Sequence, residues 1–437
     1  MSAAIPDDGP PPVPPGRVDL FGLDRDGLVT LLADLGEPAY RARQVAAWLA
    51  RGVDDPLDMT DLPRDLRDRL VHLAAGSRPE LVAHHVADGG RTQKFLLRFA
   101  DGEAVETVLM RYPRRATVCV STQAGCAMGC PFCATGQAGL RRQLTAGEIV
   151  RQVAVAQRAL ADGAVGDVPL DGDGPDHVTN VVFMGMGEPL ANLEATVAAV
   201  RWLHDPEGFG LSARALTVST VGLVPAIGRL AELGLPITLA VSLHAATDAL
   251  RDELVPVNRV HPIADLERAV RAYRARTRRR ITLEWCLIGD VNDDDAQADA
   301  LAGVARRLRA HVNIIPMNPT PGVRWREPDP DRTRAFASRV GRAGVAVTLR
   351  DTRGRDAEAA CGQLLAARTL GDGRILPLAR GAADRVAALA AASTDPSSSG
   401  RAPAGPAPTA AAPAPNPFQD GPVTSRGRSG PRGGDPR

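Results

Sequence analysis

The strongest constraint on the fold of this 437-residue chain is a regular alternation of short apolar strands and amphipathic helices that begins near residue 116. One of these helices starts with a capping box, Thr145-Ala-Gly-Glu148, directly before an apolar run. Alternating strands and helices predict a parallel sheet covered by helices. Six or seven such units favour the α/β class and a partial (βα)6-type barrel. The predicted strands are 117–121, 178–184, 215–219, 237–242, 281–287, 312–315 and 345–349.

Smaller regions are predicted on either side of the barrel. Leucines at helical spacing, beginning with Leu28, Leu31 and Leu32, predict a group of small helices. Three strands at 81–86, 94–99 and 105–110 then predict a β meander, and the Gly/Asp-rich stretch 162–176 predicts a surface insertion. Both ends of the chain hold too little apolar surface to fold. The predicted boundaries are a disordered leader (1–17), a helical domain (18–77), the meander (81–115), the barrel (116–383) and a disordered tail (384–437).

Composition limits the cellular setting more than the function. The formal net charge is +1, so bulk electrostatics does not indicate nucleic acid, and Lys94 is the one lysine among 52 basic residues. No stretch of about 20 apolar residues and no apolar signal core is present, so we expect a cytoplasmic protein without a membrane span. In that compartment thiols stay reduced, and disulfides are transient or catalytic.

Three cysteines, Cys126, Cys130 and Cys133, lie in one short loop directly after the first barrel strand. A Cys-x3-Cys-x2-Cys run supplies three thiolates to a [4Fe-4S] cluster and leaves one iron without a protein ligand. An iron with an open position can bind a small molecule and pass it one electron. The alternative is a structural zinc knot, but zinc needs a fourth ligand that no other Cys or His of the loop provides.

Polar or glycine-rich sequences recur at the ends of the later strands. Gly187 and Glu188 follow the second strand, and in a barrel the strand ends carry the chemistry. Each sequence alone is explained by capping or turn chemistry, but their recurrence at four strand ends indicates one shared pocket. The other positions are Ser219, Ser242, Leu243, His244 and Asn318.

Three further cysteines lie outside the loop. Cys286 is inside an apolar strand and is predicted to be a core residue. Cys119 lies in the first strand, and Cys361 follows the last strand. Spacing alone leaves open whether these two are functional, or a buried thiol and a chance surface thiol.

Together these motifs identify a resemblance to a known family. The chain resembles the radical-SAM adenine C2-methyltransferases of 23S rRNA at Cys119, the cysteine loop, Gly187-Glu-Pro189, Ser242-Leu-His244 and the Ala-Ala-Cys361-Gly-Gln segment. Enzymes of this family also modify the adenosine beside the anticodon of some tRNAs. The likeness runs from about residue 18 to 380. It implies a radical-SAM barrel, one [4Fe-4S] cluster, two molecules of S-adenosylmethionine (SAM) per turnover, an electron donor such as flavodoxin, and a monomer. It also implies that the N-terminal helices dock RNA.

The resemblance also implies a role for each thiol. Cys361 would receive a methyl group from one SAM and become S-methylcysteine. A radical made from a second SAM would remove hydrogen from that methyl group, and the carbon radical would add to C2 of the adenine. Glu106 would accept the C2 proton, and Cys119 would attack the sulfur of Cys361, releasing RNA through a transient disulfide. By the same resemblance, SAM would be bound by the strand-end residues Gly187, Glu188, Ser219, Ser242, Leu243, His244 and Asn318.

Two alternatives remain at this stage. A related enzyme methylates C8 of the same rRNA adenine, confers antibiotic resistance and shares the cysteine set. The other is a non-catalytic iron–sulfur protein that binds RNA. Cys119 and Cys361 argue against it, because such a protein has no use for two further thiols.

Overall fold

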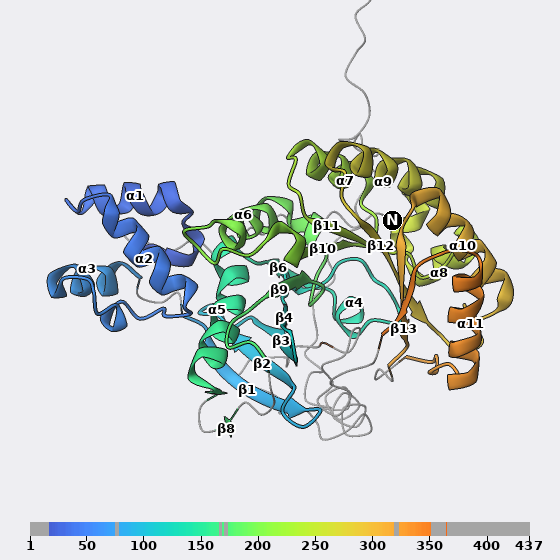
Figure 1. The fold of residues 1–437 in the computed structure, drawn as a ribbon, viewed down its shortest axis with the longest axis horizontal. Coiled ribbons are helices and arrows are strands. Elements are labelled where there is room, and N and C mark those ends of the chain that lie inside the picture. Colours follow the sequence, from blue (N-terminus) through green and yellow to red (C-terminus); the bar gives the residue numbers. More distant parts are fainter. Residues whose placement is uncertain are drawn as a thin grey trace, which may run out of the picture. The chain divides into compact units, whose positions relative to one another are not determined.

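A computed structural model of the chain describes residues 17–74, 78–165, 168–169, 174–318, 323–350 and 364. Cys361 and the predicted leader and tail lie outside these residues. Within them, ten strands form one sheet in the order β1-β2-β3-β4-β9-β10-β11-β12-β13-β14. The strands from β4 to β14 run parallel, and β1 to β4 pair antiparallel. The predicted partial barrel is therefore confirmed, and the predicted meander extends its sheet (Figure 1).

The strands agree closely with the predicted apolar runs. Their bounds in the main sheet are β1 (Glu80–Ala87), β2 (Thr92–Arg98), β3 (Ala104–Tyr112), β4 (Arg115–Cys119), β9 (Asn180–Phe183), β10 (Leu216–Thr220), β11 (Thr238–Ser242), β12 (Ile281–Leu287), β13 (His311–Pro316) and β14 (Val347–Leu349). Two short hairpins stand apart from this sheet, β5 (Gln123–Gly125) with β6 (Leu140–Gln143) and β7 (Ala164–Val165) with β8 (Val168–Pro169). The second hairpin lies in the predicted insertion.

Helices connect the parallel strands, and α7, α9, α10 and α11 lie outside the curved row of strands in Figure 1. The capping box at the start of α5 is present, because Thr145 accepts from the Glu148 amide and Glu148 from the Thr145 amide. Among the described residues no helix is long and apolar enough to cross a membrane. The helices are α1 (Arg25–Asp34), α2 (Tyr40–Ala50), α3 (Arg64–Ala74), α4 (Ala134–Ala138), α5 (Ala146–Asp162), α6 (Leu193–His204), α7 (Val224–Glu232), α8 (Asp248–Leu254), α9 (Ile263–Thr277), α10 (Asp295–Leu308) and α11 (Pro330–Arg342).

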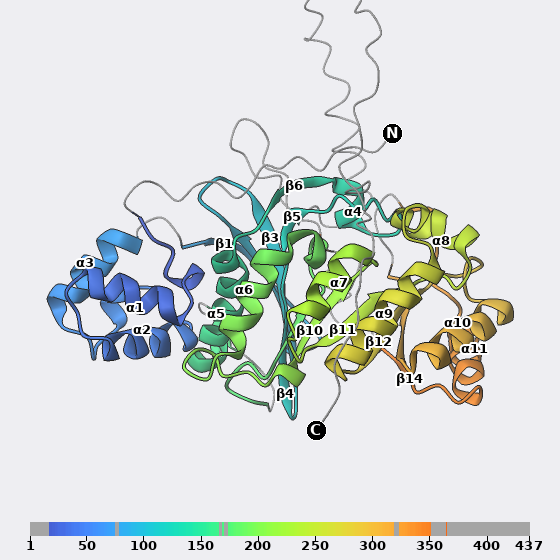
Figure 2. The same cartoon turned by 90° about the horizontal axis from the view of Figure 1, so that it is seen from above.

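A buried arginine of α5 binds acids at both ends of the first two N-terminal helices. Arg151 is 3% exposed, and its guanidinium binds Asp19 at 2.8 Å and Asp54 at 3.1 Å. Asp19 precedes α1 and Asp54 follows α2, and α2 lies beside α5 in Figures 1 and 2. A buried arginine with two carboxylate partners gives this junction a defined geometry.

Alternation along the strands separates the two faces of the sheet. In β10 Leu216 and Val218 are buried, whereas Thr217 and Ser219 are half-buried and point to the opposite face. The apolar residues pack against the helices, and the polar residues face the inside of the barrel. The candidate site lies on that inner face.

Candidate active site

The cysteine loop lies in a small hairpin that the sequence did not reveal. Cys126 follows β5, and Cys133 is the N-cap of α4, after which the chain returns as β6. Gly125 has φ +80°, and a Cβ there would lie 1.9 Å from the Gly139 carbonyl oxygen. Only glycine lets the two ends of the loop approach this closely. The cysteines are thus held at the base of a closed loop.

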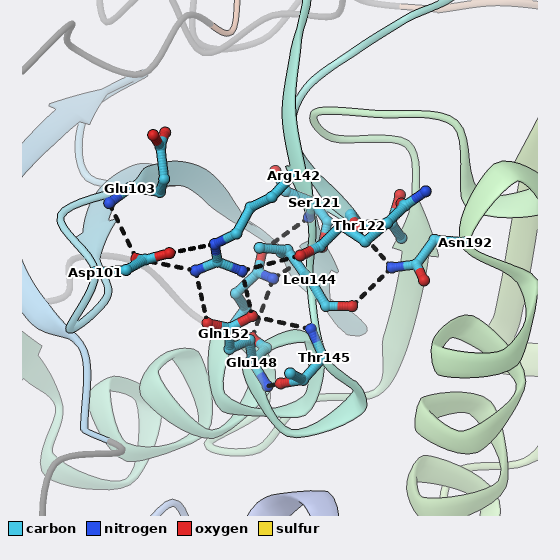
Figure 3. Close-up of polar contacts among 11 residues, drawn as sticks. Asp101, Glu103, Ser121, Thr122, Arg142, Leu144, Thr145, Glu148, Gln152 and Asn192 are labelled. Carbon is cyan, nitrogen blue, oxygen red and sulfur yellow. Dashed lines mark hydrogen bonds and ion pairs between the residues drawn. The ribbon is translucent and has the colours of Figure 1, made fainter. Parts of the chain in front are cut away.

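A buried arginine fixes this hairpin to the rest of the fold (Figure 3). The Arg142 guanidinium on β6 donates to both carboxylate oxygens of Glu148 at 2.8 Å and is also paired with Asp101. Glu148 is in turn the capping residue of α5. The Asn192 amide donates to the carbonyls of Thr122 at 2.9 Å and Leu144 at 2.7 Å, and so bridges the outer ends of the hairpin. The loop therefore has a rigid support.

The three thiols line a single cavity. Burial raises the pKa of Cys126 to about 12 and that of Cys130 well above its usual value, so both are neutral thiols in the protein alone. Within the described residues, no three His, Cys, Asp or Glu side chains are gathered closely enough to hold a single metal ion. Three soft donors around one cavity fit a larger iron–sulfur cluster, whose iron would stabilise the thiolate forms.

The same cavity brings together most of the strand-end residues named above. It encloses about 160 Å³ and is lined by Gly187, Glu188, Ser219, Ser242, His244 and Asn318 beside the three cysteines. Leu243 is the exception, because its side chain is 1% exposed and belongs to the apolar core. The recurrence of polar residues at strand ends was therefore a sound guide to one pocket.

Glu188 is the most buried carboxylate near the cysteines. It is 2% exposed and accepts from the amides of Leu190 at 3.1 Å and Val221 at 2.8 Å. Burial nevertheless raises its pKa to about 7. The preceding Gly187 has φ +99°, and a Cβ there would meet the Gln123 side chain at 2.5 Å. An ammonium group of a ligand would stabilise the ionised form of Glu188.

His244 is neutral and fixed in orientation. Its φ is +57°, and burial together with the nearby Arg251 charge lowers its pKa to about 3. Its Nδ1 accepts from the Cys286 amide at 2.9 Å, which places the proton on Nε2. The ring of Phe132 from the cysteine loop meets the imidazole edge-on, with centroids 5.0 Å apart. His244 therefore forms a wall between the loop and β12.

The fully buried Arg251 of α8 holds two of the strand-end loops. It donates to the carbonyls of Leu243 at 3.1 Å, Ser242 at 3.2 Å and Val221 at 2.6 Å. A fourth bond at 2.9 Å goes to Asn258. Burial lowers its pKa to about 10, which leaves it charged near neutral pH. Because its charge also acts on Cys130, it lies close to the cysteine loop.

Some lining residues were missed or misassigned by sequence. Cys286 was predicted as a core residue; it is half-buried, packs against a small apolar cluster and also lines the cavity with Glu284. The prediction missed the cavity because an apolar run does not show which residues of a strand face the barrel interior. The sequence did hold a signal for this position. Alternate residues of a strand share a face, so counting from Thr282 puts Thr282, Glu284 and Cys286 on the same side of the sheet.

Glu106 and Cys119 are not part of the cavity lining, yet they lie on the same face of the sheet. Cys119 lies opposite Val108 on β3, and Glu106 is two residues from Val108, so Glu106 and Cys119 share a face. On its other side Cys119 lies opposite Val182, which lies opposite Thr217 on the barrel-facing side of β10. Glu106 is fully buried, and its carboxylate lies 3.1 Å from the ammonium of Lys94. The chain's one lysine therefore forms a buried ion pair with the proposed proton acceptor.

The segment that carries Cys361 is described at one residue only. Leu364 is 4% exposed, and its carbonyl accepts from the Thr135 hydroxyl at 2.6 Å. Thr135 lines the cavity and lies two residues after Cys133. A residue three positions from Cys361 thus contacts the cysteine loop.

Comparison with known proteins gives a consistent result. Residues 18–75 match the family described as "Ribosomal RNA large subunit methyltransferase N-terminal domain". The probable dual-specificity RNA methyltransferase RlmN of Parafrankia sp. is 53% identical over 355 residues, which cover 79% of this chain and 91% of the relative. That of Salinispora tropica is 50% identical over 351 residues, covering 80% and 93%.

A solved structure agrees with these relatives. The crystal structure of a radical SAM methyltransferase from Sphaerobacter thermophilus has a TM-score of 0.74 and 48% identity, and the match covers 79% of this chain and 99% of the other. These findings confirm the resemblance seen in the motifs. The chain belongs to the RlmN family of dual-specificity RNA methyltransferases, which are radical SAM enzymes.

Proposed function

We propose that this enzyme methylates C2 of an adenosine in 23S rRNA and of the adenosine beside the anticodon of tRNAs. One observation carries the proposal: the three thiols of the cysteine loop line the same cavity as the strand-end residues expected to bind SAM. Membership of the radical SAM enzymes implies an iron–sulfur cluster and SAM. The finer assignment is one [4Fe-4S] cluster on Cys126, Cys130 and Cys133, with two SAM molecules consumed per turnover.

The C2 carbon of adenine is electron-poor and will not attack the methyl group of SAM. When bound, the cluster supplies one electron for the reductive cleavage of SAM and hence the radical that activates a methyl group. The chain supplies the carrier of that methyl group, Cys361, whose sulfur becomes a thioether. It also supplies the acceptor for the C2 proton, Glu106.

The buried ion pair supports this role for Glu106. A fully buried carboxylate next to an ammonium remains ionised at a lower cost than one without a cation, and only the ionised form can take a proton. The backbone amide of Glu106 lies 3.4 Å from the Met186 sulfur, and its carbonyl accepts from the Ser121 hydroxyl at 2.7 Å. The strand that carries the base is therefore tied to the loop after β9.

Two thiols share the covalent step. Cys119 lies on the barrel face of β4, and the Thr135–Leu364 bond joins the Cys361 segment to the cavity wall. A three-residue segment spans at most about 11 Å, so its tether is short. After the RNA is joined to Cys361, attack by the Cys119 thiolate on the Cys361 sulfur breaks the sulfur–carbon bond and leaves a disulfide. The carbon on C2 takes the electron pair of that bond and a proton, and methylated RNA is released.

The RNA substrate and the setting follow from the same account. A base must leave its stack to enter a pocket inside a barrel, which costs a few kcal/mol in duplex RNA, so loops and single-stranded RNA are preferred. The N-terminal domain at 18–75 is proposed to dock the RNA. The enzyme is proposed to act as a cytoplasmic monomer, with a flavodoxin-like protein as electron donor.

An anaerobic assay with SAM, a reductant and either an rRNA fragment or tRNA tests the proposal. The expected product is C2-methyladenosine in both RNAs, identified by mass spectrometry of nucleosides. C8-methyladenosine would identify the related resistance activity instead. Tight RNA binding without any product would show a non-catalytic protein.

A further inference from the structure

Glu284, at the centre of β12, is a buried carboxylate with no role in the chemistry described so far. It is 4% exposed and lines the cavity that holds the three cysteines. Its Oε1 accepts from the Asn313 amide at 2.8 Å. Among the described residues, its buried Oε2 has no hydrogen-bond partner, although Thr282 and the Arg350 charge also act on this carboxylate. A buried carboxylate oxygen without a donor is costly and requires an explanation.

The position of Glu284 limits which part of a ligand it can meet. Glu188 follows β9, close enough to Cys126 and Cys130 to act on both electrostatically. Glu284 is on β12, three strands further along the sheet. At about 4.8 Å between neighbouring strands, the two carboxylates belong to regions about 14 Å apart. A ligand with its amino-acid end near the cysteines and Glu188 therefore extends its nucleoside towards Glu284.

The immediate neighbour of Glu284 is a residue already expected to bind SAM. Ser242 pairs with Glu284 in register on the adjacent strand, so the two side chains share one face of the sheet. Burial raises the pKa of Glu284, and a hydrogen-bond donor from a ligand would favour its ionised form. Two neighbouring hydroxyl groups are donors that a carboxylate accepts well, as in nucleotide-binding folds that hold a ribose.

We propose that Glu284 binds the ribose of SAM, with its carboxylate accepting hydrogen bonds from the hydroxyl groups while Asn313 fixes its orientation. This inference rests on the proposed binding of SAM in the cavity. It adds to the strand-end residues a contact from the middle of a strand. Glu284 is thus a binding residue for the nucleoside half of SAM, on the side of the cavity away from Glu188.

Binding measurements by calorimetry on the cluster-loaded enzyme test the proposal. The probes are SAM, 5′-deoxyadenosine, which has both ribose hydroxyls but no methionine, and 2′,5′-dideoxyadenosine, which lacks one hydroxyl. Glu284→Gln is expected to weaken the binding of SAM and of 5′-deoxyadenosine about 10- to 100-fold, the change in affinity that corresponds to losing hydrogen bonds to a charged group. Wild type should bind the dideoxy probe less tightly than 5′-deoxyadenosine, and Glu284→Gln should lose most of this discrimination.

The matched control is Glu267→Gln, which changes a buried carboxylate that pairs with Arg271 and Arg307 outside the cavity. It should leave all three affinities unchanged. Should Glu284→Gln fail to fold, Glu284→Asp keeps the charge but withdraws the oxygens by one methylene, and it too should lose discrimination between the two nucleosides.

Two results would overturn the inference in distinguishable ways. Wild-type affinity and full hydroxyl discrimination in the Glu284 variants would exclude the ribose contact while leaving SAM binding intact. A wild-type enzyme that binds neither SAM nor 5′-deoxyadenosine would overturn the proposed SAM pocket together with this contact.

Discussion

Glu188 gives the sharpest physical test of the cavity, because its burial should make the stability of the protein depend on pH. The pKa of this carboxyl rises from 4.5 to about 7 on folding because it loses water. At about 1.36 kcal/mol per pKa unit, the difference corresponds to about 3 kcal/mol. Between these two pH values the folded state holds a proton that the unfolded state has released.

The sign of the effect follows directly. Below pH 4.5 the carboxyl is protonated in both states, and the full stability is present. As pH rises towards about 7 the unfolded state is favoured by deprotonation, so the free energy of unfolding falls by about 3 kcal/mol in total. Above pH 7 the carboxyl is ionised in both states and the contribution stays constant.

Glu188→Gln removes this titration. The free energy of unfolding in urea is measured at pH 5, 6, 7 and 8 for the protein without its cluster. Relative to wild type, the free energy of unfolding of the variant should rise by about 3 kcal/mol over this range. Some constant loss is expected at all pH values, because Gln offers one fewer acceptor to the amides of Leu190 and Val221. The exposed Glu232→Gln is the control and should follow wild type. Parallel pH curves for Glu188→Gln and wild type would refute the argument from burial.

Three further predictions concern the cluster, its loops and RNA docking. Cys126→Ala removes one of the three proposed cluster ligands and should lower iron content and abolish SAM cleavage; full iron content and cleavage would exclude the ligand assignment. Arg251→Met removes the hydrogen bonds to the carbonyls of Val221, Ser242 and Leu243. It should weaken SAM binding at least tenfold and lower the free energy of unfolding by about 3 kcal/mol. The control Arg259→Met changes an exposed arginine and should have neither effect. Deletion of residues 1–76 should reduce methylation of long RNA more than SAM cleavage, and unchanged RNA methylation would rule out docking by the N-terminal helices.

The sequence predicts the strands, the cysteine loop and the pocket at the strand ends because these depend on local patterns. A short apolar strand between helices and a polar residue at its end are both visible within a few positions. The buried partners of the pocket are different. Arg251 bonds to Val221, which is 30 residues away, and Glu106 on β3 pairs with Lys94 on the neighbouring strand β2. Such contacts depend on sheet register and loop packing, which no local pattern encodes.

Cys286 shows the same limit within a single strand. In a parallel sheet both faces of a strand are covered, so an apolar run looks uniform in sequence. The pairing of Glu284 with Ser242 and Asn313 shows which face this side chain occupies, and Cys286, two residues further along, lines the same cavity. The residues missed by sequence were therefore those whose direction, rather than identity, decides their role.

The division of labour between Cys361 and Cys119 tests the proposed mechanism most directly. The measurement is a denaturing gel of Cys119→Ala and Cys361→Ala enzymes purified after reaction with RNA, with ribonuclease treatment as the control. Cys119→Ala can still methylate Cys361 and join it to the base, but it lacks the thiol that breaks the bond. It should therefore accumulate a protein–RNA crosslink, whereas Cys361→Ala should form none. A crosslink in Cys361→Ala instead, or in neither variant, would contradict the covalent mechanism proposed for this chain.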